Sequence, residues 1–101
     1  MADHWTVHRW WVPMELEGCF VGEWRVLAQM LVAEGLMESV SLFADVDDHR
    51  VRWTPLRWSS QTAWRAWRAD VRHRSVEKAM AVHCERAEVH HLTTVLTVDI
   101  R

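Results

Sequence analysis

The hydrophobic period changes within residues 51–71, and this change constrains the fold more than any other feature. Before Ser59 the residues alternate between two faces, with Val51, Trp53 and Pro55 on one and Arg52, Thr54, Leu56 and Trp58 on the other. A period of two indicates a β-strand. After Ser60 the apolar residues recur at helical spacing, at Ala63, Trp64, Trp67 and Val71. The segment predicts a strand over residues 50–58 that runs into a helix, with Ser60 as its N-cap.

The same two periods predict the remaining elements. Residues 4–12, 40–46 and 92–100 alternate and predict three further strands. Pro13 ends the first of them, and a helix follows whose apolar stripe is Leu16, Phe20, Trp24, Leu27 and Leu31. Gly35 is expected to end that helix. The helix after Ser60 is expected to bend or break between Asp70 and Ser75 and to continue as a helical piece over residues 76–83.

The order strand, helix, strand, strand, helix, strand predicts an α+β fold of the ferredoxin-like βαββαβ type. We expect one domain over residues 1–101, because a chain of this length supports a single core. Right-handed crossovers place both helices on one face of a four-stranded antiparallel sheet. The other face would be bare and apolar, so we expect a homodimer in which two sheets pack face to face as a dimeric α/β barrel.

Composition and charge argue against several classes of protein. The chain has no apolar run long enough to span a membrane, and its polar start does not resemble a signal peptide, so we expect a cytoplasmic protein without membrane association. Residues 50–74 carry a formal charge of +6 and the remainder −8. The basic segment fits either a solvated surface or an anionic partner. The net charge of −2 argues against nucleic acid as that partner.

No metal site is expected. Asp45, Asp47 and Asp48 lack the glycine and the closing glutamate of a calcium loop. The His90-His91 and His83-Cys84 pairs match no zinc spacing.

Four motifs in order along the chain carry a resemblance to a known family. They are Phe20 with Trp24, Glu34-Gly35-Leu36, Asp47-Asp48 before the third strand, and Trp58-Ser59-Ser60 followed by Ala63, Trp64 and Trp67. In their order and spacing they resemble the antibiotic biosynthesis monooxygenase family of dimeric α/β-barrel proteins. That family includes cofactor-free oxygenases of aromatic polyketides and haem-degrading oxygenases.

The resemblance implies chemistry without a cofactor. The axial histidine of the haem-degrading members falls on Val76, so the haem ligand is missing. Their strand-one Asn-Arg pair falls on His8-Arg9, and their strand-three tryptophan on Trp58. The anthrone-type oxygenases pair that tryptophan with an asparagine and often a tyrosine, and this chain contains neither residue type.

The candidate site therefore centres on His8 as a proton-transfer group and Trp58 as a stacking wall. A histidine beside tryptophans can accept or give a proton near neutral pH, although a structural histidine in an aromatic core fits the same pattern. Arg9, Arg52 or Arg57 would hold an oxyanion. His73 is the alternative proton-transfer group. The residues expected to contact substrate are Trp10, Arg52, Thr54, Arg57, Trp64, Trp67 and His73.

The sequence leaves three functions open. The first is a cofactor-independent monooxygenase that acts on a polycyclic aromatic, polyketide-type intermediate. The second is a polyketide cyclase or isomerase that uses the same acid-base pocket. The third is a non-catalytic module that binds a small aromatic ligand, either neutral or anionic.

Overall fold

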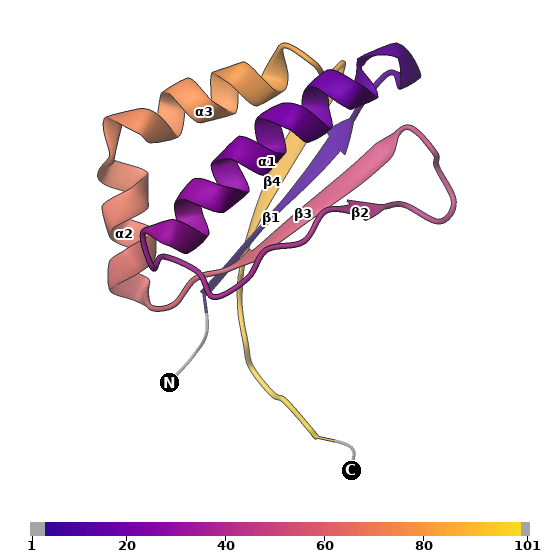
Figure 1. Cartoon of the computed structure of the whole chain (residues 1–101). Helices are drawn as coiled ribbons and strands as arrows, with labels where there is room; N and C mark the ends of the chain where they lie inside the picture. Colours follow the sequence, from indigo (N-terminus) through magenta and orange to yellow (C-terminus); the bar gives the residue numbers. More distant parts are fainter. Residues whose placement is uncertain (1–3, 100–101) are drawn as a thin grey trace.

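A computed structural model describes residues 4–99, and within that range it shows a four-stranded antiparallel sheet with helices on one face (Figure 1). The strand order is β2-β3-β1-β4, which confirms the predicted ferredoxin-like fold. A 3-10 turn at Met14–Leu16 precedes the first helix. The elements are β1 (His4–Trp11), α1 (Glu17–Ala33), β2 (Phe43–Ala44), β3 (Val51–Arg57), α2 (Gln61–Ala69), α3 (Val71–Ala81) and β4 (Arg86–Thr93).

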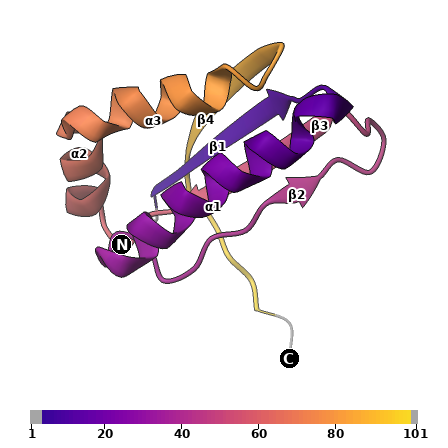
Figure 2. The same ribbon diagram turned by 45° about the horizontal axis from the view of Figure 1, so that its top comes forward.

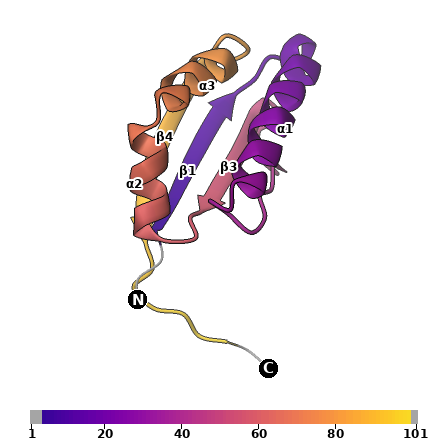
Figure 3. The same cartoon turned by 60° about the vertical axis from the view of Figure 1, so that its left-hand side comes forward.

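The helices form one layer over the sheet. Figure 3 shows α1 beside β3 and the α2–α3 pair beside β4, with β1 between them, and Figure 2 shows the same layer from above. The core lies between the two layers, and its buried members include Trp10, Phe20, Trp24, Leu31, Met37, Leu56, Trp58, Trp64, Trp67 and Met80. The opposite face of the sheet has no helix over it in the described part of the chain. None of the helices described is both long and apolar enough to cross a membrane.

The junction between β3 and α2 forms as predicted. The Ser60 hydroxyl accepts a hydrogen bond from the Ala63 amide at 3.0 Å, which caps α2. Trp64 and Trp67 are buried on the face that the helical period indicated. The same face was expected to include Val71, and this is wrong, because Val71 is 84% exposed. The helix breaks at Asp70, whose ψ of 133° is extended, so Val71 begins a new helix with a different direction.

The helix α1 ends as predicted at Gly35, which has a φ of +72°. This left-handed conformation is favourable for glycine and reverses the chain. The Leu36 amide then donates to the Leu31 carbonyl at 3.0 Å, which closes the helix end.

The second strand is much shorter than predicted. Residues 40–46 alternate, but β2 contains only Phe43 and Ala44 among them. The Asp45 carboxylate accepts hydrogen bonds from the Asp47 and Asp48 amides, which turns the chain directly after Ala44. Before β2, Val40 and Leu42 pack against the core as irregular chain.

The prediction for the last strand is wrong in its bounds. We expected residues 92–100, whereas β4 is Arg86–Thr93, and Ile100 lies outside the described residues. β4 pairs with β1 from Trp11 opposite Arg86 to His4 opposite Thr93, so residues 94–99 extend past the described start of β1. Val95, Leu96 and Val98 are 94%, 79% and 75% exposed. Figure 1 shows this segment in yellow, leading away from the sheet.

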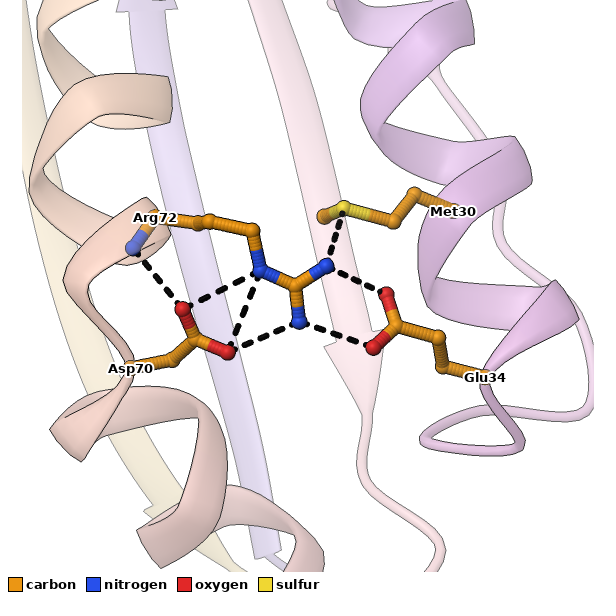
Figure 4. Close-up of polar contacts among 4 residues, drawn as sticks. All are labelled: Met30, Glu34, Asp70 and Arg72. Carbon is orange, nitrogen blue, oxygen red and sulfur yellow. Dashed lines mark hydrogen bonds and ion pairs between the residues drawn. The ribbon is translucent and has the colours of Figure 1, made fainter.

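An arginine clamp ties the helices together (Figure 4). The Arg72 guanidinium donates to both oxygens of Glu34 at 2.8 Å and to Asp70 at 2.7 Å. It also contacts the Met30 sulfur at 3.3 Å. Hydrogen bonds from Arg72 lower the pKa of Asp70 to about 2 and hold the pKa of Glu34 below its ordinary value. The clamp joins the end of α1 to the α2–α3 junction.

The clamp predicts acid-sensitive stability. The pKa values of Asp70 and Glu34 are lower in the folded state than in the unfolded state, so the folded state binds fewer protons. The stability that these two carboxylates add to the folded state is present above the ordinary carboxyl pKa. It is lost as pH falls from about 4.5 towards 2. Arg72→Gln should therefore flatten the fall in melting temperature over this range, measured by circular dichroism. Parallel curves for the two proteins would contradict this account.

Candidate active site

A cavity of about 240 Å³ lies between the helices and the helix-covered face of the sheet. Its walls are mainly indole rings and aliphatic side chains, which is typical of a site for a small aromatic ligand. The strands contribute alternate residues because successive side chains point to opposite faces. The lining residues are Thr6, His8, Trp10, Trp24, Leu27, Leu31, Thr54, Leu56, Trp58, Trp64, Trp67, Arg68, His73, Val76, Glu77, Met80, Val89 and His91.

Two indole N–H groups bond to threonine hydroxyls on the floor of this cavity. Trp10 on β1 donates to Thr54 on β3 at 2.9 Å, and Trp58 at the end of β3 donates to Thr6 on β1 at 3.1 Å. Each bond runs diagonally across the β1–β3 ladder, because Thr54 lies opposite His8 and Thr6 lies opposite Leu56. All four bonded side chains are buried. The bonds satisfy both buried indole N–H groups and fix the planes of both rings.

A carboxylate joins two histidines at one side of the cavity. The Glu77 Oε1 atom lies 3.1 Å from His73 Nε2, one helical turn away on α3, and 3.4 Å from His8 Nε2 on β1. The His8 ring stacks on Trp10 with 5.0 Å between centroids and 11° between planes. Its Nδ1 atom is buried and has no hydrogen-bond partner within residues 4–99. The hydrogen bond from His8 and the neighbouring His73 hold the pKa of Glu77 below its ordinary value.

Further imidazole and guanidinium groups lie beside Trp64. His4 stacks on the Trp64 ring at 4.9 Å, and His91 lies 5.3 Å from the same ring. The Arg68 guanidinium is 6.0 Å from the ring centroid on α2. Desolvation lowers the pKa of His91, and the neighbouring His4 and Arg68 lower it further. The lowered pKa favours the neutral form of His91.

The structure brings most of the predicted site residues together. His8 and Trp58 line the same cavity, and so do the predicted contact residues Trp10, Thr54, Trp64, Trp67 and His73. His8 and His73, which the sequence offered as alternatives, share one carboxylate. Their roles in catalysis stay predictions.

Three predicted arginines do not line the cavity. Arg9 is on the opposite face of β1, where its guanidinium lies 4.5 Å from the Trp11 ring and 5.2 Å from the Trp53 ring. Arg52 lies near the start of β3, where its Nε atom donates a hydrogen bond to the Glu17 carboxylate at 3.1 Å. Arg57 lies in a separate polar hollow with Glu38, Ser39, Trp58 and Ser59. Their placement gives no support to an oxyanion role in this cavity.

Glu77, Arg68 and His91 line the cavity and were not among the predicted site residues. Glu77 is four residues after His73, and this helical spacing was the available signal for it. Arg68 was visible as a member of the basic segment at residues 50–74. His91 could not be assigned to the cavity, because the predicted last strand began at residue 92, whereas β4 begins at Arg86.

The donor groups around the cavity do not form a metal site. No group of three or more His, Cys, Asp or Glu side chains in residues 4–99 is arranged to hold a metal ion. The position at which the resemblance places a haem ligand is Val76, an apolar side chain that lines the cavity. Val76 has no atom that can ligate a haem iron, so the axial position that the resemblance implies is not conserved in this chain.

The fold is shared with solved structures at low sequence identity. A mutant of SnoaB, a cofactor-independent oxygenase from Streptomyces nogalater, superposes with a TM-score of 0.80 at 16% identity, over 95% of this chain and 96% of that one. A protein from Mycobacterium tuberculosis gives 0.79 at 13% identity, over 96% and 99%. An antibiotic biosynthesis monooxygenase gives 0.72 at 14% identity, over 94% and 99%.

No protein-family model and no curated protein matches the sequence. The structural similarity supports the resemblance to antibiotic biosynthesis monooxygenases at the level of the fold.

The buried indole bonds predict a measurable cost when an acceptor is removed. Thr54→Val keeps the shape of the side chain but leaves the Trp10 N–H without its partner. We expect a loss of about 1–3 kcal/mol in the free energy of unfolding, measured by urea denaturation. The matched control is Thr62→Val on the exposed side of α2, where the change should be within about 0.5 kcal/mol. Equal effects of the two substitutions would show that the bond contributes little.

Proposed function

We propose that this protein is a cofactor-independent monooxygenase that acts on a polycyclic aromatic, polyketide-type substrate. The observation that carries the proposal is the cavity. His8 lies at one side of it, next to the Glu77 carboxylate, and indole rings form much of its wall. Flat rings suit the stacking surfaces of Trp58, Trp64 and Trp67. The shared fold with SnoaB supports the same class of reaction.

The residues of the cavity can carry out the proton transfer that this chemistry requires. A substrate with an acidic C–H or phenolic O–H group gives its proton to His8, and the electron pair of that bond stays on the substrate. The resulting carbanion or phenolate, delocalised over the rings, gives an electron to dioxygen and then forms a carbon–oxygen bond. Return of the proton and loss of water leave one oxygen atom on the product as a carbonyl. The apolar walls exclude water from the reactive anion.

The proposal includes a homodimer. On the sheet face without helices, Phe43 and Leu92 are each 52% exposed, and Trp5, Trp11 and Trp53 are half-buried. Val95, Leu96 and Val98, in the segment that follows β4 away from the sheet, are exposed apolar side chains as well. A second copy of the chain could cover both, because an isologous interface needs a self-complementary apolar patch.

The dimer predicts a molar mass twice that of the 12.0 kDa chain. Light scattering coupled to gel filtration at micromolar concentration measures this mass directly. Trp53→Glu, which places a charge in the apolar face, should shift the protein towards the monomer. A monomer mass for the unmodified protein would refute the proposed dimer.

The oxygenase predicts oxygen consumption with an anthrone. The probe is dithranol, a tricyclic ketone with an acidic methylene group, followed with an oxygen electrode and by product absorbance. His8→Ala should lower turnover roughly a hundredfold or more, which is the usual contribution of a positioned base. The matched control is His83→Ala, because His83 lies outside the cavity, 3.9 Å from Glu23. That variant should keep the rate of the unmodified protein.

Other outcomes would indicate the other functions. Full activity of His8→Ala together with inactive His73→Ala would move the base to α3. Conversion of a substrate without oxygen uptake would indicate a cyclase or isomerase. Quenching of tryptophan fluorescence by dithranol without turnover would indicate a binding module. An anionic ligand and the absence of nucleic acid partners also stay predictions, and Arg68 is the arginine placed to meet an anion.

A further inference from the structure

Two exposed basic side chains line the cavity where α2 lies beside β4 (Figure 3). His91 on β4 lies opposite Thr6 on β1, so both side chains point to the helix-covered face of the sheet. Arg68 comes from α2, in the helical layer. The Arg68 guanidinium lies 6.0 Å from the centroid of the Trp64 indole, and the His91 ring lies 5.3 Å from it. We call this part of the cavity wall, formed by Trp64, Arg68 and His91, the basic edge.

Within residues 4–99 the charge at the basic edge is not balanced by an acid. Among these residues, no carboxylate forms an ion pair with Arg68. Glu77 is the only acid among the lining residues, and its Oε1 atom already contacts His8 and His73. An arginine that no carboxylate occupies presents its N–H groups as a planar fork, which matches the two oxygens of a carboxylate. The basic edge is therefore arranged to accept an anion from a ligand in the cavity.

The ionisation of His91 responds to the same imbalance. Desolvation lowers the pKa of His91 most, and the charges of His4, Arg68 and His8 lower it further. Glu77 raises this pKa, but its effect is the smallest of these. An anion bound beside Arg68 would offset the repulsion and favour the protonated imidazole. Both ring nitrogens of His91 would then be donors, so His91 could give the anion a second hydrogen bond.

We propose that the basic edge is an anion subsite and that the substrate is a polycyclic aromatic acid whose carboxylate binds Arg68 and His91. This inference rests on the proposed function, because it assigns the substrate class of the same cavity. The rings occupy the apolar part of the cavity, and the carboxylate stays at the exposed edge, where it keeps part of its hydration. One guanidinium and one imidazole match the single charge of a carboxylate better than the double charge of a phosphate.

Two compounds with the same ring system test the subsite without turnover. Rhein is a dihydroxyanthraquinone that carries a carboxylate, and aloe-emodin carries a hydroxymethyl group at the same position. Quenching of tryptophan fluorescence measures the Kd of each compound. Rhein should bind more tightly than aloe-emodin, and added salt should reduce the difference, because salt screens the charge at an exposed edge. Rhein that binds no more tightly than aloe-emodin would overturn the proposal.

Substitution of Arg68 tests which group binds the carboxylate. Arg68→Gln should raise the Kd of rhein roughly tenfold and that of aloe-emodin less than about twofold, because only rhein loses a charged contact. The matched control is Arg65→Gln, which makes the same change in net charge on the same helix. Arg65 is exposed and does not line the cavity, so this variant should keep the Kd of rhein. Equal Kd values for rhein in the two variants would contradict the subsite.

The pKa of His91 is a second and independent measurement. It is obtained from the imidazole NMR resonances, followed against pH with and without each compound. Rhein should raise the pKa of His91 towards or above the ordinary histidine value of ~6.5, because a neighbouring anion stabilises the imidazolium. Aloe-emodin should not raise it. An unchanged His91 pKa in the rhein complex would overturn the role assigned to His91.

Turnover of the corresponding anthrones separates this inference from the proposed function. Arg68→Gln should raise KM for rhein anthrone roughly tenfold with little change in kcat, because the lost contact is to the carboxylate and not to the reacting C–H group. His8→Ala should lower kcat for both anthrones. If the unmodified protein oxidises both anthrones with equal kcat/KM, the anion subsite is wrong and the oxygenase stands. If neither anthrone reacts while rhein still binds through Arg68, the oxygenase proposal fails for anthrones and the subsite stands.

Discussion

The two indole–hydroxyl bonds across β1 and β3 are the interactions on which the cavity depends. A core with so many tryptophans would gain buried apolar area by closing over the empty space. Closing requires the floor indoles to turn, and turning would break the bonds from Trp10 to Thr54 and from Trp58 to Thr6. Each broken bond would leave a buried N–H group unsatisfied, at a cost of about 1–3 kcal/mol. The two bonds therefore hold the floor indoles in place, and the space above them stays open.

The sequence predicted those parts of the fold that depend on local periodicity. The stripe of α1, the cap at Ser60 and the alternation of β3 are properties of neighbouring residues, and the structure confirms them. The bounds of β4 could not be obtained in this way. Residues 92–100 alternate as well as any strand in the chain, but pairing with β1 is decided by register, which places Arg86 opposite Trp11. Apolar and polar residues still alternate after Thr93, but this segment has no pairing with β1, and its apolar side chains are exposed.

The difference between local periodicity and long-range packing also explains which site residues could be predicted. Alternation places His8, Trp10, Thr54 and Trp58 on one face, and all of them line the cavity. Arg9 was chosen from the family resemblance, although as the neighbour of His8 on a strand it must point to the other face. Glu77 is separated from His8 by 69 residues and meets it only through the packing of α3 on the sheet. A contact of this kind has no signal in a local pattern.

The Arg72 clamp connects the fold to the site. The break at Asp70 gives α3 a direction independent of α2, and Arg72 in the first turn of α3 fixes that direction by binding Glu34 at the end of α1. Glu77 lies five residues further along the same helix, so its distance from His8 depends on how α3 is held. An exposed ion pair alone contributes little stability. Here the bidentate contact with Glu34 and the contacts with Asp70 act together as a constraint on geometry. The position of the carboxylate beside His8 is thus set by charges outside the cavity as well as by the aromatic core within it.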